Sequence, residues 1–289
     1  MRWLIIGCNG QLGTDLMTLL ATEDVIGLDY PDIDITEAES VQRAISTADP
    51  QIVINAAAYT AVDAAEEDEA TALAVNGRGP EIIAHALAAR EYGRLIHLST
   101  DYVFPGTASQ PYAEEAAPGP QSAYGRTKLA GEQAVRAILP ERSQIVRTAW
   151  LYGEHGNNFV KTMIRLASER ETVSVVDDQM GQPTWSRDLA AQLLRLAEKD
   201  TPAGIYHGTN AGQCSWYEFT REIFSLIGAD PQRVLPTTTD AFPRPAPRPA
   251  FSVLGHDGWR KADISPMRNW REAATVAVPR IAAGIAADS

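Results

Sequence analysis

The feature that most constrains the fold of this chain is a glycine pattern directly after a short apolar run at the N-terminus. Residues 3–6 are apolar and lead into Gly7-x-x-Gly10-x-x-Gly13, and a helical pattern follows over residues 11–21. Glycines let the backbone turn tightly and approach a phosphate, which then lies at the positive end of the helix. An ordinary glycine-rich turn is the alternative. We predict a strand–loop–helix unit that binds the pyrophosphate of a dinucleotide.

Short apolar runs alternate with longer helical patterns through the first half of the chain. Buried strands that alternate with helices are typical of a parallel sheet covered on both faces. We therefore predict an α/β fold, with a Rossmann-type doubly wound parallel sheet, for an NAD(P)-binding domain over residues 1–149. The expected strands are residues 3–6, 25–28, 52–55, 95–98 and 145–147, and the expected helices are 11–21, 37–48, 67–90 and 122–138.

The pattern is looser after residue 150. We predict a smaller C-terminal α/β portion over residues 150–289 that binds substrate, with some segments returning to the first domain. Prolines at every second position between 243 and 249 exclude a helix or a central strand, so residues 242–249 are expected to form an ordered loop. The expected strands are 173–176 and 204–207, and the expected helices are 155–170, 186–199 and 215–228.

Composition excludes several classes of protein. The net charge of −12 argues against a nucleic-acid partner, because phosphate binding needs a basic face. Two cysteines, Cys8 and Cys214, predict no disulfide framework and a cytoplasmic location. The N-terminal apolar run is too short for a signal peptide, and no stretch of about 18 apolar residues predicts a membrane span. The five histidines show no spacing typical of metal ligands.

Two strand ends suggest how a dinucleotide would be held. The second strand ends at Asp29, whose carboxylate can bind adenosine ribose hydroxyls and would repel a 2′-phosphate. This favours NADH over NADPH, although an arginine elsewhere can still reach the 2′-phosphate. The alternative is that Asp29 is simply a solvated acid at the end of a strand. Asp34 and Ile35 are further candidates for the adenine edge. Small residues after the third strand allow close approach of a flat cofactor or, alternatively, plain helix packing: Asn55, Ala56, Ala57, Ala58, Tyr59 and Thr60.

A tyrosine and a lysine four positions apart predict acid–base chemistry. On a helix, Tyr124 and Lys128 lie on one face. A free phenol has a pKa near 10, and a neighbouring ammonium lowers it by about one to three units. Thr100, at the end of the strand over residues 95–98, offers a hydroxyl to a substrate carbonyl. The spacing alone arises by chance in most proteins, but together with the glycine loop it predicts carbonyl reduction, with hydride from a nicotinamide and a proton from Tyr124.

A local excess of basic residues suggests where an anionic substrate would bind. Between residues 240 and 261 there are four basic and two acidic side chains, which suits a diphosphate in a chain of negative net charge. Arg248 is the strongest candidate, and Trp216 and Phe242 are candidates to stack on a base. A solvated proline-rich loop is the alternative.

Several segments between residue 4 and about residue 254 resemble the extended short-chain dehydrogenase/reductases, and more narrowly the dTDP-4-dehydrorhamnose reductase family. The segment over residues 178–184, which contains Gln-x-Gly-x-Pro-Thr, and the Arg-Pro pair at residues 248–249 point to the narrower family. The other matching segments are residues 7–13, 55–63, 99–106, 124–132 and 156–160.

This resemblance implies reduction of the 4-keto group of dTDP-4-dehydro-6-deoxy-L-mannose by NADH or NADPH. It implies Thr100, Tyr124 and Lys128 as catalytic residues. Substrate contacts are expected from Thr100, Asp101, Trp150, Asn158 and Arg248. Cofactor contacts are expected from Gly7, Gly10, Gln11, Leu12, Gly13, Asp29, Asp34, Ile35, Asn55, Ala56, Ala57, Ala58, Tyr59, Thr60, Leu98, Tyr124 and Lys128.

Two other functions agree with the same residues. One is the reduction of another dTDP-4-keto-6-deoxy sugar, and the other is a non-catalytic regulatory subunit, as in methionine adenosyltransferase. Some members of the family form dimers through magnesium held by acids on two helices. Asp15 is placed for the first acid, but Arg187 stands where the second is expected. We therefore predict no metal, and either a monomer or a homodimer.

Overall fold

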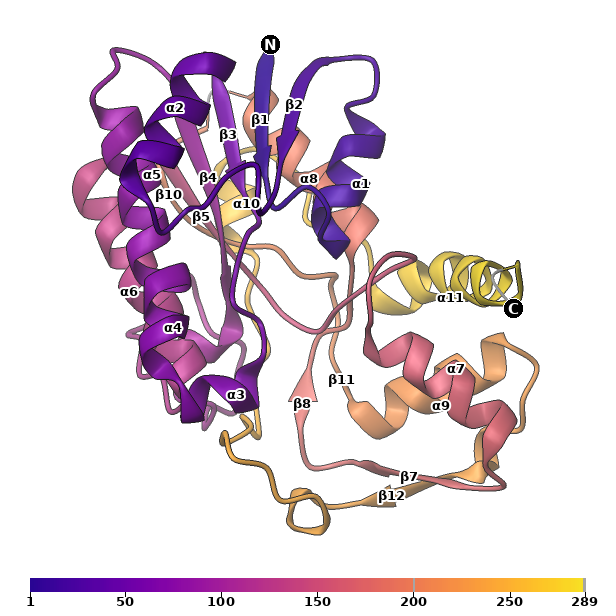
Figure 1. Cartoon of the computed structure of the whole chain (residues 1–289). Coiled ribbons are helices and arrows are strands. Elements are labelled where there is room, and N and C mark those ends of the chain that lie inside the picture. The colour runs from indigo at the N-terminus through magenta and orange to yellow at the C-terminus, as the bar shows by residue number, and fades with distance from the viewer. Residues whose placement is uncertain (200, 288–289) are drawn as a thin grey trace.

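The centre of the computed structural model, which describes residues 1–199 and 201–287, is a six-stranded sheet (Figure 1). All its neighbouring strands pair in parallel, in the order β10-β5-β4-β3-β1-β2. The predicted doubly wound α/β fold is therefore confirmed. The strands are β1 (Arg2–Ile6), β2 (Asp24–Leu28), β3 (Ile52–Asn55), β4 (Arg94–Thr100), β5 (Ser143–Thr148) and β10 (Gly204–His207).

Helices cover both faces of this sheet, because alternate residues of its strands point to opposite sides. In β1, Leu4 and Ile6 pack into one core with helices α2 (Ala38–Ala48), α5 (Gly79–Ala88) and α6 (Ala123–Ile138). Trp3 and Ile5 pack into a second core with helices α1 (Gln11–Leu19) and α8 (Ser186–Glu198). Both sets are buried, which explains why the strands read as continuous apolar runs.

The strand register brings the loops that follow five strands to one edge. Ile6 pairs with both Leu28 and Asn55, and Thr100 pairs with Thr148. The carboxyl ends of β1 to β5 therefore lie side by side. In open α/β sheets, ligands bind at this edge.

A third core lies beside the sheet, at the lower right of Figure 1. Helices α7 (Phe159–Glu169), α9 (Trp216–Leu226) and α11 (Trp270–Ala287) enclose it. The parallel strands β7 (Val173–Val176) and β12 (Val234–Thr237) flank these helices. Two short ribbons lead into this part: β6 (Leu151–Tyr152) with β9 (Thr184–Trp185), and β8 (Met180–Gly181) with β11 (Cys214–Ser215).

Most predicted elements are present with shifted ends, and the strands over 173–176 and 204–207 agree with the prediction. The single helix predicted over 67–90 is instead α4 (Glu69–Leu73), a π-helical turn η1 (Ala74–Arg78) and α5. Helix α3 (Val62–Glu67) was not predicted. Helix α11 was also missed, because its buried face is made largely of alanine and Pro279 lies inside it. Residues 242–249 contain no strand and no α-helix, as predicted.

The two predicted halves are interleaved. Helix α8 packs in the core that contains α1, and β10 forms an edge of the main sheet beside β5. Helix α10 (Asp257–Lys261) contributes Trp259 to the same core. The boundary at residues 149/150 stays a prediction. Across the described part of the chain, no helix combines the length and apolar character needed to cross a membrane.

Candidate active site

A cavity of about 820 Å³ runs along the carboxyl edge of the sheet. The glycine loop, the ends of β2 to β5 and the first turns of α6 line it. Eighteen of the predicted site residues contribute to its walls, namely Gly7, Gly10, Gln11, Leu12, Gly13, Asp29, Asp34, Ile35, Ala56, Ala57, Ala58, Thr60, Leu98, Thr100, Asp101, Tyr124, Lys128 and Trp150.

The glycine loop forms a cradle that other residues would fill. Gly7 has φ of +84°, and a Cβ there would lie 2.6 Å from the amide nitrogen of Ala57. A Cβ on Gly13 would lie 2.0 Å from the carbonyl oxygen of Gly7. Helix α1 begins directly after Gly10, with no side chain capping its N-terminus. Its first amides are thus available to an anion, and the loop fits the pyrophosphate of a nicotinamide dinucleotide.

Asp29 stands at one end of the cavity with both carboxylate oxygens accepting hydrogen bonds. Oδ2 accepts from the amide of Asn9 at 2.9 Å, and Oδ1 accepts from the amide of Tyr30 at 2.8 Å. Among the described residues that line the cavity, Lys128 is the single basic side chain. A 2′-phosphate beside Asp29 would therefore meet negative charge without a lining arginine, which agrees with the predicted preference for NADH.

The predicted catalytic residues converge from β4 and α6. Thr100 ends β4, and its hydroxyl acts on the phenol of Tyr124, whose pKa it works to lower. Lys128, one turn further along α6, donates from Nζ to the carbonyl oxygen of Leu98 at 2.6 Å. Ser122 caps this helix by accepting a hydrogen bond from the amide of Gly125. The cap and the two strand contacts fix the start of α6 against β4.

Burial dominates the ionisation of these groups. It raises the pKa of Tyr124 to about 12 and lowers the pKa of Lys128 to about 8, while the charge of Glu132 opposes the second shift. The expectation that Lys128 lowers the pKa of Tyr124 is wrong for this structure, because loss of hydration dominates the shift and the charge of Asp101 adds to it, while only the Thr100 hydroxyl opposes it. Tyr124 is therefore protonated at neutral pH, as a proton donor requires.

Asp101 and Trp150 also line the cavity. Asp101 is buried, and Thr100 donates a hydrogen bond to its Oδ1 at 3.0 Å. Burial raises the pKa of Asp101 to about 6, although hydrogen bonds from Ser252 and Thr100 oppose the shift. Trp150 has φ of +48°, an unfavourable conformation for a residue with a side chain.

Two predicted cofactor residues do not line the cavity. Asn55 is completely buried, where its Oδ1 accepts from the amide of Ala57 and its Nδ2 contacts Nδ1 of His97 at 3.2 Å. Tyr59 packs in a small apolar cluster with Ala65, Ala72 and Ala123. These residues shape the loop after β3 rather than the cavity wall.

Two predicted substrate residues also lie outside the lining. Asn158 caps α7 and donates from Nδ2 to Oε1 of Gln11 at 2.9 Å, so it contacts a lining residue instead. Arg248 forms an ion pair with Asp63 at 2.8 Å and lines a neighbouring hollow of about 300 Å³. Tyr102 borders both spaces.

The sequence did not predict one polar residue that supports the site, and it did not predict the other residues that line the cavity. Asn76, in the π-helical turn, accepts from the amide of Tyr59 and donates to its carbonyl and to Oγ1 of Thr127. The signal available in the sequence was an asparagine within the helical pattern predicted over residues 67–90. The other lining residues are Ile6, Tyr30, Ile33, Thr36, Val62, Val75, Ser99, Tyr102, Thr148, Ala149, Leu151, Gly156 and Asn157.

The position of Asp15 does not fit a magnesium site. Asp15 is buried, and its Oδ2 accepts a hydrogen bond from Ser186 at 2.5 Å. Among the described residues, no group of three or more His, Cys, Asp or Glu is arranged to hold a metal. The carboxylate of Asp15 is thus already bonded to Ser186, and the absence of a metal stays a prediction.

The chain is similar over nearly its whole length to several proteins named as reductases of dTDP sugars. A relative from Streptomyces antibioticus, named probable dTDP-4,6-dihydroxy-2-methyloxan-3-one 4-ketoreductase, is 50% identical over 98% of this chain and 96% of its own. The dTDP-4-dehydrorhamnose reductase of Streptomyces griseus is 49% identical over 97% and 94% of the two chains. The structure of dTDP-4-dehydrorhamnose reductase from Bacillus anthracis in complex with NADP has a TM-score of 0.91 and 40% identity, and the match covers 97% and 98% of the two chains.

A family model described as RmlD substrate binding domain matches residues 1–282, which is nearly the whole chain. The match includes the glycine cradle, the Thr100–Tyr124–Lys128 group and the C-terminal core. The chain therefore belongs to the RmlD family, that of the dTDP-4-dehydrorhamnose reductases.

Proposed function

We propose that this chain reduces the 4-keto group of dTDP-4-dehydro-6-deoxy-L-mannose to give dTDP-L-rhamnose, with NADH or NADPH as the reductant. The observation that carries the proposal is the convergence of Thr100, Tyr124 and Lys128 on the cavity that begins at the glycine cradle. A hydroxyl, a protonated phenol and a buried lysine beside a dinucleotide site suit carbonyl reduction.

In this proposal each residue has a separate task. The bound dinucleotide supplies hydride. The hydroxyl of Thr100, which lines the cavity with Tyr124, positions the substrate carbonyl oxygen, and Tyr124 gives its proton to the alkoxide that forms there. Lys128 is fixed by Leu98 beside the expected nicotinamide ribose and adds positive charge next to the developing anion.

The remaining predicted residues are assigned to binding. Asp101 and Trp150 line the same cavity as the catalytic group and are proposed to contact the sugar. Arg248 is proposed to reach the diphosphate from the adjacent hollow, after exchange of its ion pair with Asp63. We further propose that the protein acts in the cytoplasm as a monomer or homodimer.

A second candidate is a reductase for another dTDP-4-keto-6-deoxy sugar. The Streptomyces antibioticus relative, with 50% identity, carries the name of such a ketoreductase, and the rhamnose-pathway relative from Streptomyces griseus is as similar, with 49%. Both activities use the same catalytic group, so the choice rests on contacts to the sugar.

The experiment is an assay of cofactor oxidation. Purified protein is given NADH or NADPH with dTDP-glucose that an upstream dehydratase and epimerase convert in place, and loss of the reduced-nicotinamide absorbance is followed. We expect rapid oxidation with dTDP-L-rhamnose as product. Oxidation that does not need the epimerase supports the second candidate. Cofactor binding without oxidation of any keto sugar contradicts both and supports the regulatory subunit.

A further inference from the structure

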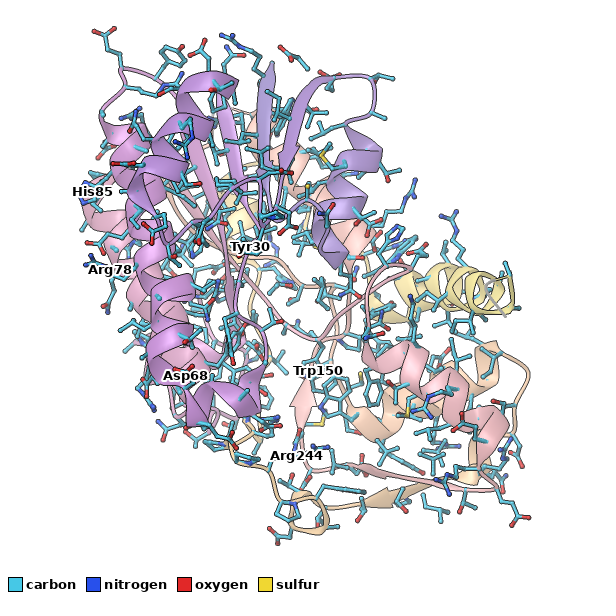
Figure 2. The ribbon with its side chains drawn as sticks, in the orientation of Figure 1. Tyr30, Asp68, Arg78, His85, Trp150 and Arg244 are labelled. Carbon is cyan, nitrogen blue, oxygen red and sulfur yellow. The ribbon has the colours of Figure 1, made fainter. Side chains whose placement is uncertain are left out.

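Trp150 is held in an unusual way for a residue that lines a cavity. It follows β5 and has φ of +48°. Such a conformation persists where surrounding contacts enforce it, and it is concentrated at functional sites. Figure 2 shows Trp150 in the middle of the molecule, between the sheet and the C-terminal helices. Its carbonyl accepts a hydrogen bond from the amide of Thr184 at 3.1 Å, which fixes its backbone.

The indole of Trp150 is fixed on one side by a second indole. The rings of Trp150 and Trp216 are stacked, with centroids 3.6 Å apart and planes 10° apart. Phe159 supports Trp216 with a centroid distance of 4.3 Å. Trp216 is the first residue of α9, which a complete capping box between Ser215 and Glu218 anchors. Trp216 does not line the cavity, so it is placed to act through Trp150.

Gly181 fixes the same indole from another direction. A Cβ on Gly181 would lie 2.4 Å from Cε2 of Trp150, a distance that real Cβ contacts do not reach. Gly181 belongs to β8, which pairs with β11 immediately before Trp216. It is also the glycine of the Gln-x-Gly-x-Pro-Thr segment, and Thr184 of that segment is the residue bonded to the Trp150 carbonyl. The segment thus frames one aromatic side chain.

We propose that Trp216 is a positioning residue that, together with Gly181, holds the Trp150 indole as a rigid aromatic wall for the sugar ring of the substrate. The inference rests on the proposed function for the identity of that ring. A flat aromatic surface packs against the C–H face of a six-membered sugar ring, and fixing the indole in advance avoids its ordering cost on binding. We expect the Trp150 indole to contact the sugar and not the dinucleotide, because the dinucleotide is expected at the glycine cradle.

Three variants test the proposal. Trp216→Leu removes the stacked ring, and Trp216→Phe keeps an aromatic ring. Gly181→Ala introduces a methyl group that clashes with the Trp150 indole and leaves Trp216 unchanged. Tyr217→Leu is the matched control, since Tyr217 is the neighbouring, half-buried aromatic residue of α9 and its ring lies near Arg221 rather than Trp150. Circular dichroism is sensitive to the stack, because two coupled indoles whose transition dipoles are skewed give a pair of bands of opposite sign. Trp216→Leu should lose the pair, and Tyr217→Leu should keep it.

Calorimetric binding of dTDP-L-rhamnose and of dTDP, each with the dinucleotide present, then isolates the contribution of the sugar. The ratio of the two affinities should fall about two- to tenfold in Trp216→Leu and in Gly181→Ala, the range expected for an aromatic pair. It should largely recover in Trp216→Phe and stay unchanged in Tyr217→Leu. In turnover assays KM for the keto sugar should rise by a similar factor, with kcat and KM for NADH nearly constant.

An unchanged affinity ratio in both Trp216→Leu and Gly181→Ala would overturn the inference. An equal loss of affinity for dTDP and dTDP-L-rhamnose would also overturn it, since it would indicate general damage to the site. Binding does not require turnover, so the two proposals can fail separately. If the wild-type protein binds dTDP-L-rhamnose more tightly than dTDP but reduces no keto sugar, the proposed function is contradicted and the role of Trp150 as an aromatic wall stands. If the wild-type protein binds both ligands equally, only the role of Trp150 as an aromatic wall is contradicted.

Discussion

At the scale of single residues, the site depends on which groups keep their protons. Thr100, Tyr124 and Lys128 were predictable because their spacing places them on a strand end and one helix face. The direction of the Tyr124 pKa shift was not, because it depends on how completely the fold excludes water from the phenol. The sequence likewise shows Arg248 as a local cation but cannot show that Asp63, 185 positions earlier, already pairs with it.

Replacement of Tyr124 by phenylalanine removes the proposed proton donor and leaves the ring. Tyr124→Phe should lower kcat by about 10²–10⁴, the usual contribution of a positioned acid–base group, and leave the Kd for NADH unchanged. Steady-state kinetics and a fluorescence titration measure the two quantities. Tyr102→Phe removes another phenol that lines the same cavity but is not the proposed donor, so its loss of kcat should be much smaller. Wild-type turnover in Tyr124→Phe would exclude this phenol as the donor.

The choice between the two dinucleotides is assigned to Asp29. Its carboxylate would repel a 2′-phosphate, and no arginine is found among the described residues that line the cavity. The wild type should therefore bind NADH more tightly than NADPH. Asp29→Ala should narrow that difference by about tenfold, roughly the 1.4 kcal/mol expected from removing one nearby like charge. Titration of both dinucleotides checks this, and an equal ratio of affinities in wild type and variant would remove Asp29 as the selector.

The pH dependence of activity should report Lys128. Burial lowers its pKa to about 8, so the ammonium loses its proton as the pH rises through about 8. If the charge supports catalysis, kcat/KM should fall above that pH. Tyr124, with its pKa raised to about 12, should add no loss in this range. The residual activity of Lys128→Met should lack the fall near pH 8. A wild-type profile that stays flat beyond pH 10 would show that the charge of Lys128 is not needed.

At the scale of elements, a buried ion pair joins the helix and strands that carry the catalytic group. Glu132, on the same face of α6 as Lys128, accepts two hydrogen bonds from Arg147 of β5, at 2.9 and 2.7 Å. It also accepts a hydrogen bond from Ser99 of β4, next to Thr100. Both charged side chains are only 2% exposed. The spacing of Glu132 from Lys128 was visible in the sequence, but its partners on two strands were not.

Glu132→Gln should therefore cost about 3–5 kcal/mol of the free energy of unfolding, because it leaves Arg147 buried without a counter-charge. Urea denaturation followed by circular dichroism measures this loss. The matched control is Arg126→Gln, also on α6, whose partner Glu69 and own side chain are 45% and 44% exposed. That exposed pair should contribute about 0–1 kcal/mol. Similar losses for the two variants would contradict a special role for the buried pair.

At the scale of the whole molecule, the order of the chain and the order in space differ. The predicted division at residues 149/150 follows a real change in pattern, because the regular alternation of strands and helices ends there. However, α8 and β10 come later in the chain and complete the first sheet and one of its cores. Two-residue strands such as β6 and β8 carry too little periodicity to predict, so the paths that lead back to the sheet were invisible in the sequence.

This interleaving predicts that residues 1–149 do not fold alone. Without β10 the backbone of β5 would become a free sheet edge, and without α8 the apolar residues of α1, such as Leu12 and Leu16, would face water. A fragment of residues 1–149 should aggregate or lack a cooperative unfolding transition, as judged by size-exclusion chromatography and circular dichroism. Co-expression with residues 150–289 should restore a complex that binds NADH. If the fragment alone is monomeric and unfolds cooperatively, the first 149 residues form an independent domain, and α8 and β10 only cover it.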